Sequence, residues 1–209
     1  MKRFLRSAAV GVFSPLIVAS ACTRTPPEPT STSAASSSPA APAQAVSAGP
    51  SEQPARCILA TPVTPPPAAA PAPAGRCPKD PSPNTLSMVD LSIETGRGPV
   101  PFKAELAKTA SETERGLMYR TQMPEEQGMI FDLGPPRREH SFWMRNTCIP
   151  LDMLFIDTDG LIVGILENVP TLNDAERTVG CPSGWVLEMN AGWCRRHGVR
   201  AGQSMKLPH

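Results

Sequence analysis

The sequence predicts an α+β fold with mainly antiparallel strands, arranged as a compact, partly closed, barrel-like sheet with two short helices. Two observations support this fold class. Short segments of alternating apolar and polar residues recur throughout the C-terminal half, separated by turn-forming residues. Signals for helix starts and stops mark only two short helices in the same region.

The alternation predicts seven strands, and one pair is joined by a recognisable turn. Asp157-Thr158-Asp159-Gly160 is a strong turn sequence, so its two flanking strands should form a β-hairpin over residues 151–166. The predicted strands are 89–93, 100–106, 129–133, 140–144, 151–156, 161–166 and 185–189.

The two predicted helices have different start signals. Thr109 and Glu112 have capping-box spacing, which predicts a helix from 110 to about 119. Gly116 inside that helix suggests close backbone contact, because glycine costs up to about 1 kcal/mol relative to alanine. A second helix should follow Asn190 as its cap and stop at Gly198.

Residues 1–21 have the pattern of an export signal. Three basic residues precede an uncharged, mostly apolar stretch that is too short to span a bilayer. The stretch ends in small residues before Cys22 and resembles a bacterial lipoprotein signal, in which this cysteine is acylated. We therefore expect an outer-membrane or periplasmic protein of a Gram-negative-type envelope, held to the membrane through lipid on Cys22. Plain secretion is the alternative.

Residues 22–87 are rich in Pro, Ala, Ser and Thr, with 16 prolines between positions 23 and 87. Such a segment buries too little apolar area to offset the entropy of ordering its backbone. The sequence therefore predicts a disordered linker ahead of one globular domain at 88–209. Cys57 and Cys77 lie in this linker, and a disulfide between them is the first interpretation. A zinc site is disfavoured because no CxxC pair or histidine lies nearby.

Charge and composition exclude several function classes. The chain carries 20 Lys and Arg against 19 Asp and Glu, a formal net charge of +1. This balance argues against a nucleic-acid-binding protein. Six cysteines in 209 residues indicate an oxidising compartment or a metal site. The sequence predicts no cofactor and no metal ion.

Three cysteines lie in the predicted domain. Cys148 stands just before the first strand of the hairpin, and Cys181 ends the loop after its second strand, so both belong to one end of the hairpin. A Cys148–Cys181 disulfide is therefore expected. Cys194 is left free or paired with a linker cysteine.

Six blocks of residues resemble a known family. They are Gly116–Arg120, Gly128–Phe131, Phe142–Thr147, Ile149–Asp152, Asp159-Gly160 and Val186–Gly192. In this order they resemble the domain of unknown function (DUF) 192 family, small bacterial and archaeal domains that often carry export signals. The resemblance covers Val100 to Met205 and implies an α+β fold rich in antiparallel strands, without a settled activity. Cys148 departs from the family, which usually has an aliphatic residue there, and so does Trp193-Cys194.

Two pairs of side chains suggest catalysis. Cys194 and His197 are three residues apart on the second helix, but no third residue orients them, and an exported thiolate tends to oxidise. Asp152 and Glu188 could act as acid and base in a hydrolase or transferase. The interpretation we favour is that Glu188 is exposed and Asp152 caps a backbone turn.

The segment 140–147 is the strongest candidate for ligand binding. Alternation places Trp143 and Arg145 on one face, beside Asn146 and near Asp152. An indole flanked by guanidinium, amide and carboxylate groups suits a small polar or sugar-like ligand. The alternative is a buried Trp143, with the polar residues holding the loop.

The sequence as a whole predicts an exported, lipid-anchored protein whose domain binds a small polar ligand or an envelope partner. Arg120, after the first helix, is either an anion contact or a surface ion pair. The alternatives are an extracytoplasmic hydrolase or transferase and a purely structural envelope protein. The candidate ligand-binding residues are Arg120, Trp143, Arg145, Asn146, Asp152 and Glu188.

Overall fold

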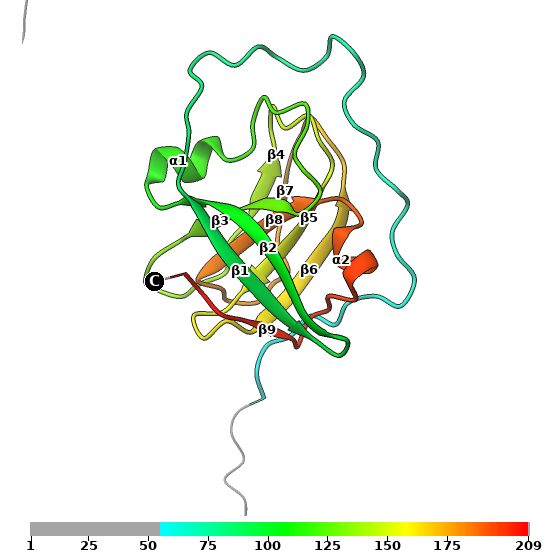
Figure 1. The fold of residues 1–209 in the computed structure, drawn as a ribbon, viewed down its shortest axis with the longest axis vertical. Helices are drawn as coiled ribbons and strands as arrows, with labels where there is room; N and C mark the ends of the chain where they lie inside the picture. The colour runs from blue at the N-terminus through cyan, green and yellow to red at the C-terminus, as the bar shows by residue number, and fades with distance from the viewer. Residues whose placement is uncertain (1–54, 209) are drawn as a thin grey trace, which may run out of the picture. The chain divides into compact units, whose positions relative to one another are not determined.

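A computed structural model describes residues 55–208 of the chain (Figure 1). The predicted signal peptide, the predicted lipidation site at Cys22 and the linker up to residue 54 lie outside the described residues. Among residues 55–208, no helix is long and apolar enough to cross a membrane.

The described residues form nine strands and two short helices. Seven strands make one sheet in the order β6-β5-β8-β3-β2-β1-β9, and β4 and β7 make a separate two-stranded ribbon. The strands are β1 (Met88–Thr95), β2 (Gly98–Ala107), β3 (Gln127–Asp132), β4 (Phe142–Met144), β5 (Leu151–Ile156), β6 (Ile162–Val169), β7 (Asn173–Arg177), β8 (Trp185–Asn190) and β9 (Ser204–Met205), and the helices are α1 (Ala110–Arg115) and α2 (Trp193–His197).

The large sheet is mixed, so the prediction of a mainly antiparallel sheet is wrong. β2 and β3 run parallel, with Lys103 opposite Gln127 and Ala107 opposite Phe131. The connection between them contains α1 and returns the chain to the edge where β2 began, as a parallel pair requires. Alternation of apolar and polar residues is the same in parallel and antiparallel strands, so the sequence pattern could not distinguish them.

The predicted hairpin at 151–166 is present as β5 and β6, while both helices differ in detail from the prediction. The capping box of Thr109 and Glu112 is formed, but α1 ends at Arg115 because Gly116 adopts a φ of +46°. The second helix ends at Gly198 as expected. Its cap is Gly192 rather than Asn190, whose amide donates to carbonyl groups of the 123–124 loop instead.

The large sheet curls into a half-barrel whose two edge strands meet at one end (Figure 1). The backbone N–H of Ile162 donates to Gln203 at 2.8 Å, and that of Met205 donates to Gly160 at 2.9 Å. Leu161 and Ser204 form an isolated antiparallel bridge between them. The curl thus satisfies backbone groups that an open sheet would leave at its edges.

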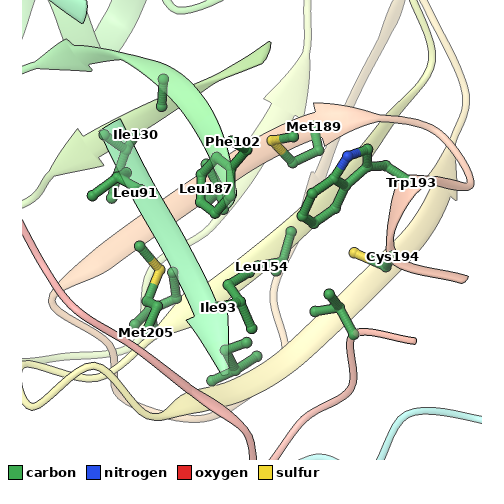
Figure 2. Close-up of a cluster of buried hydrophobic side chains, with 14 of the residues drawn as sticks. Leu91, Ile93, Phe102, Ile130, Leu154, Leu187, Met189, Trp193, Cys194 and Met205 are labelled. Carbon is green, nitrogen blue, oxygen red and sulfur yellow. The ribbon is translucent and has the colours of Figure 1, made fainter. Parts of the chain in front are cut away.

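Both faces of the sheet are buried at β3, β5, β6 and β8, which divides the core into two clusters, whereas β1 and most of β2 expose their outer face. The first cluster draws residues from both edge strands and lies inside the curl, where Phe102 packs edge-on against Trp193 with ring centroids 5.4 Å apart (Figure 2). The second cluster lies on the other face, where Leu117, Met144 and Ile149 from outside the sheet or from the ribbon complete it. Every residue of β5 is buried as a result.

Residues 57–77, here called the strap, cross the outside of the domain without a helix or strand. A disulfide joins each end to the domain, Cys57 to Cys181 and Cys77 to Cys148. The predicted disordered linker therefore differs from the structure over residues 55–87, which are attached to the domain. Two disulfides indicate an oxidising, extracytoplasmic environment.

These pairings correct both predicted disulfides, Cys148–Cys181 and Cys57–Cys77. The prediction treated the linker and the domain as separate bodies, so each pair was sought within one of them. The strap instead lies on the domain surface, which brings each domain cysteine to a strap cysteine with Cα atoms 5.5 and 5.6 Å apart. Cys194 is free and buried.

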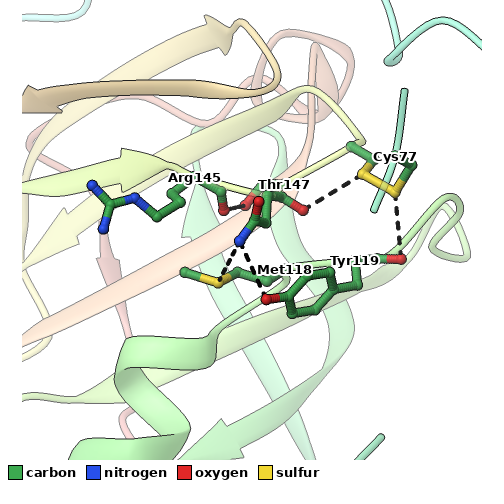
Figure 3. The surroundings of a disulfide bond; sticks show 7 residues. Cys77, Met118, Tyr119, Arg145 and Thr147 are labelled. Atoms are coloured by element: carbon green, nitrogen blue, oxygen red, sulfur yellow. Dashed lines mark hydrogen bonds between the residues drawn. A yellow bond between two sulfur atoms is a disulfide. The ribbon is translucent and has the colours of Figure 1, made fainter. Parts of the chain in front are cut away.

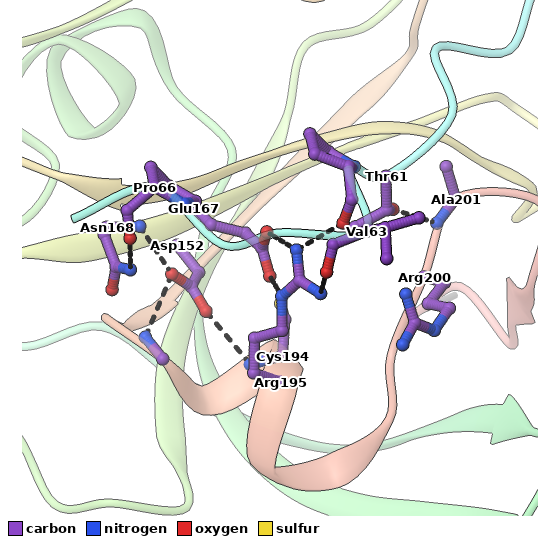
Figure 4. A network of polar contacts seen from close by, with 12 residues as sticks. Thr61, Val63, Pro66, Asp152, Glu167, Asn168, Cys194, Arg195, Arg200 and Ala201 are labelled. Carbon is purple, nitrogen blue, oxygen red and sulfur yellow. Dashed lines mark hydrogen bonds and ion pairs between the residues drawn. The ribbon is translucent and has the colours of Figure 1, made fainter. Parts of the chain in front are cut away.

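Polar contacts fix the strap between its two disulfides (Figure 4). The Arg195 guanidinium donates to the carbonyl groups of Pro62 and Val63 and also pairs with Glu167 at 2.7 Å. The Asn168 amide donates to Pro66 at 3.1 Å, within the same network. The strap side chains are largely exposed, so these hydrogen bonds and the disulfides, rather than apolar burial, hold it in place.

Closure of the half-barrel predicts a steric cost at Gly160. Its φ is +88°, and a Cβ there would overlap the Met205 carbonyl oxygen, whereas Gly202 has a similar φ of +90° and open space. Both alanine variants strain the backbone, but only Gly160→Ala also separates the closing strands. We expect Gly160→Ala to lower the free energy of unfolding by about 1–3 kcal/mol more than Gly202→Ala, measured in urea. Equal losses would contradict the closure described above.

Candidate ligand-binding cleft

A cleft of about 640 Å³ opens between the α1 segment and the β4–β7 ribbon. Its size is that of a small-molecule site. One wall comes from residues 108–118, the floor from the end of β3, and the other wall from residues 138–147 with Glu176 of β7.

The α1 wall is positioned by its capping box and by the sharp backbone turn after it. The Thr109 side chain accepts from the Glu112 N–H, and the Glu112 carboxylate accepts from the Thr109 N–H at 2.9 Å. Gly116 then lets the chain pass closely over Phe131, since a Cβ on Gly116 would lie 3.3 Å from its ring. This contact accounts for a glycine at the position where the sequence predicted close backbone approach.

Aromatic rings form much of the floor and the second wall. Phe131 and Phe142 meet edge-on with centroids 5.2 Å apart, and Phe142 contacts Phe155 at 6.1 Å in the same manner. Edge-on stacking fixes ring orientation, so this part of the cleft is rigid and apolar.

Trp143 is half-buried and lines the cleft. The Arg145 guanidinium stacks on the indole, 4.0 Å from the ring centroid, and contacts Asp174 at 3.4 Å. Arg145 is exposed and does not line the cleft, so it supports the indole from outside. This arrangement leaves the indole in place as a contact surface for a ligand.

The polar groups of the cleft include several that lack partners among residues 55–208. The Nε2 atom of His140 is buried without a hydrogen-bond partner among the described residues. Burial, with Arg138 nearby, lowers the pKa of His140, which favours a neutral imidazole. Within residues 55–208, no carboxylate lies within ion-pairing distance of Arg138 or Lys108. The exposed Arg138 and Lys108 side chains are therefore available to a ligand, beside the unpartnered His140.

Two residues next to the cleft have unusual backbone conformations. Tyr119 follows the α1 wall with a φ of 69°, and Asn146 lies in the other wall with a φ of 53°. Left-handed backbone costs a non-glycine residue about 1–3 kcal/mol, the more so for a bulky side chain such as tyrosine. The Tyr119 N–H donates to the Asn146 carbonyl at 2.7 Å, and the Asn146 amide donates to the Tyr119 hydroxyl at 3.2 Å.

Asp152, a candidate site residue, lies elsewhere and is fully buried. Its carboxylate accepts from the backbone N–H groups of Asn168, Gly192 and Cys194 at 2.9, 3.1 and 3.0 Å (Figure 4). Burial raises the pKa of Asp152, while these three donors favour its ionised form. Asp152 thus holds the start of α2 in place from a neighbouring strand.

Glu188 is buried, contrary to the exposed position that we favoured from the sequence. It lies on β8 opposite Met129 of β3 and Met153 of β5. Alternation correctly separated Glu188 from Leu187 and Met189, but the outer face of this sheet is covered by a second core. Burial raises the pKa of Glu188 to about 8.

The register keeps the two candidate acid–base residues apart. Asp152 lies opposite Met189, and the next residue of β5, Met153, lies opposite Glu188. Because successive side chains of a strand point to opposite faces, the Asp152 and Glu188 side chains lie on opposite faces of the sheet. They do not form one site, and neither lines the cleft with Trp143.

Cys194 and His197 share α2 but lack the arrangement of a nucleophile and base. Cys194 is fully buried, and burial together with the Asp152 carboxylate raises the pKa of its thiol. Such a thiol stays protonated and inert. His197 stacks on Trp193 with ring centroids 4.6 Å apart.

Arg120 forms an ion pair rather than an open anion site. Its guanidinium binds both carboxylate oxygens of Glu105, at 2.5 and 2.6 Å. Arg120 lines a smaller pocket of about 280 Å³ on the other side of the Gly116–Met118 segment.

Of the six candidate ligand-binding residues, Trp143 alone lines the cleft, together with other members of the candidate segment 140–147. The cleft residues that the sequence did not indicate come from segments far apart in the chain, among them Lys108, Phe131, Arg138 and Glu176. The strongest signal for the cleft in the sequence was Gly116 after the capping box. It predicted a close backbone contact, but it did not identify Phe131 as the partner.

The fold and cleft define a small, disulfide-stabilised β domain with a lateral ligand-sized cleft. Residues 91–207 match the model of DUF192, described as uncharacterized ACR, COG1430, and the chain belongs to this family. Both disulfides join a cysteine inside the matched region to a strap cysteine outside it. A comparison with curated proteins finds no match.

Two solved structures are similar to the domain. A Sinorhizobium meliloti 1021 protein, provisionally described as a transcription regulator, is 39% identical with a TM-score of 0.57, over 60% of this chain and 97% of that one. A Novosphingobium aromaticivorans DSM 12444 protein of unknown function is 35% identical with a TM-score of 0.56, over 67% of this chain and 94% of that one.

The buried Glu188 carboxyl predicts a pH-dependent stability. Its folded-state pKa of about 8 exceeds the ordinary value of 4.5, so the folded protein holds this proton more tightly. The associated stability is fully present below pH 4.5 and is lost as the pH rises toward 8. Glu188→Gln removes this titration, so its free energy of unfolding relative to wild type should rise by about 3 kcal/mol between pH 4.5 and pH 7.

Urea unfolding at several pH values measures this difference, with Glu94→Gln as the control at an exposed position of β1. If Glu188→Gln and wild type keep a constant difference across the range, Glu188 does not titrate as described.

Proposed function

We propose that the protein is exported and lipid-anchored through Cys22, and that its DUF192 domain binds a small polar ligand carrying a ring. The cleft between the α1 segment and the β4–β7 ribbon is the observation that carries this proposal. A purely structural domain has no need of a ligand-sized cleft in which His140, Arg138 and Lys108 have groups without partners among residues 55–208.

The cleft offers complementary contacts to such a ligand. Phe142 and Trp143 supply apolar ring surfaces, which suit stacking against a planar or sugar ring. The unpartnered Nε2 of His140 and the Arg138 guanidinium supply directional polar contacts at the same wall. Binding sites commonly combine a mostly apolar lining with a few polar groups of this kind.

Export agrees with the disulfide-bonded domain. Disulfides persist in extracytoplasmic compartments, and two of them hold the strap here.

The ligand proposal predicts that binding depends on the indole of Trp143. Ligand-observed NMR with a panel of sugars, nucleosides, aromatic amino acids and aryl glycosides should reveal compounds that bind the oxidised full chain. Trp143→Ala should weaken binding about tenfold because it removes ring stacking, while Trp143→Phe should retain most of it. The control is Lys103→Ala, since Lys103 is exposed and pairs with Asp90 away from the cleft. Equal binding by Trp143→Ala and wild type would refute the site.

The lipid anchor predicts that Cys22→Ser abolishes membrane association. The cysteine thiol is the acceptor of the lipid, so the serine variant should move from the membrane fraction to the soluble fraction and lose labelling by a fatty-acid analogue. Thr23→Ser keeps the cysteine and serves as the control. A Cys22→Ser protein that still fractionates with membranes would show that something else holds it there.

A further inference from the structure

The Cys77–Cys148 disulfide lies at the junction of the two cleft walls (Figure 3). Cys148 directly follows Thr147, which lines the cleft from one wall, and the Cys77 sulfur lies 3.6 Å from the carbonyl oxygen of Tyr119. Tyr119 in turn follows Met118, which lines the cleft from the α1 wall. The disulfide therefore contacts the backbone immediately behind both walls.

The same junction contains the two left-handed residues described above. Tyr119 and Asn146 hydrogen-bond to each other through backbone and side chain, which joins one wall to the other. The Cys148 sulfur lies 3.5 Å from the Asn146 carbonyl oxygen, so the crosslink abuts this pair. Backbone in unfavourable conformations persists only where its surroundings hold it, and the disulfide is the covalent part of those surroundings.

We propose that the Cys77–Cys148 disulfide is a redox-sensitive crosslink that sets the position of the two cleft walls, so that its reduction weakens ligand binding. The inference rests on the proposed function, because it assigns the regulation of the same cleft. When the crosslink opens, Tyr119 and Asn146 can relax to ordinary backbone conformations. Met118 and Thr147 then move with them, and the cleft loses its fixed width.

The reducing step requires a dithiol reductant and exchanges two electrons. Cys77 is partly exposed whereas Cys148 is buried, so a reductant thiolate attacks the Cys77 sulfur. The bond between the two sulfurs breaks, and Cys148 leaves as a thiolate that takes a proton. The second thiol of the reductant then displaces Cys77, which also ends as a thiol, and the reductant ends as a disulfide.

The second disulfide supplies a matched control. Cys57–Cys181 likewise joins a strap cysteine, here an exposed one, to a domain cysteine that is only 3% exposed, as Cys148 is. Neither Cys57 nor Cys181 lines the cleft. Cys57→Ser and Cys77→Ser therefore each free one end of the strap and leave one buried thiol, but only Cys77→Ser opens the crosslink behind the cleft.

Hydrogen–deuterium exchange on the oxidised full-length chain tests the structural half of the proposal without a ligand. In Cys77→Ser, amide exchange of residues 117–120 and 143–148 should rise at least about tenfold, while Cys57→Ser should leave those segments near wild type. Wild type treated with a dithiol should behave like Cys77→Ser. Unchanged exchange in Cys77→Ser, or an equal rise in Cys57→Ser, overturns the proposal.

The functional half is tested with 4-nitrophenyl β-D-glucoside, a ring-bearing sugar probe, by ligand-observed NMR. If the oxidised wild type binds it, Cys77→Ser should bind at least about tenfold more weakly and Cys57→Ser about equally; equal binding by Cys77→Ser overturns the regulation. If the oxidised wild type binds neither this probe nor any panel compound, the proposed function fails, and with it the regulation of binding. The exchange result then reports only whether the crosslink fixes the walls.

Discussion

The parallel pairing of β2 and β3 is the constraint on which the cleft depends. Two parallel neighbours cannot be joined by a tight turn, so the chain needs a long connection that leaves the sheet and returns. That connection carries α1 and Leu117 across the outer face of the sheet, above Phe131. The same crossover therefore buries the second core and builds one wall of the cleft.

The strap adds a second constraint from outside the family domain. It contributes no residue to the two core clusters, yet its two disulfides attach it to the domain at Cys181 and at Cys148. The strap is rich in proline and alanine and buries little apolar surface, so its two disulfides provide the attachment to the domain that apolar burial does not. One of them stands directly behind the cleft, so a peripheral segment borders the candidate site.

The candidate site shows where reasoning from residue patterns fails. Strand alternation correctly gave Glu188 a different face from its neighbours, but it could not show that both faces of the sheet are covered at β8. Asp152 and Trp143 are close in sequence and serve different parts of the molecule, because Asp152 turns toward α2 while Trp143 stays in the ribbon. Closeness in sequence was a poor guide to closeness in space.

Local chemistry was determined by the sequence itself: the capping box at Thr109, the hairpin around Asp157–Gly160, the glycine stop at Gly198 and the family blocks all depend on residues a few positions apart. Strand direction, disulfide partners and the members of the cleft were decided only by the tertiary structure. Each of these joins segments dozens of residues apart, such as Cys77 with Cys148, and no local preference encodes which distant segment will be the neighbour. Packing of the whole sheet makes that choice.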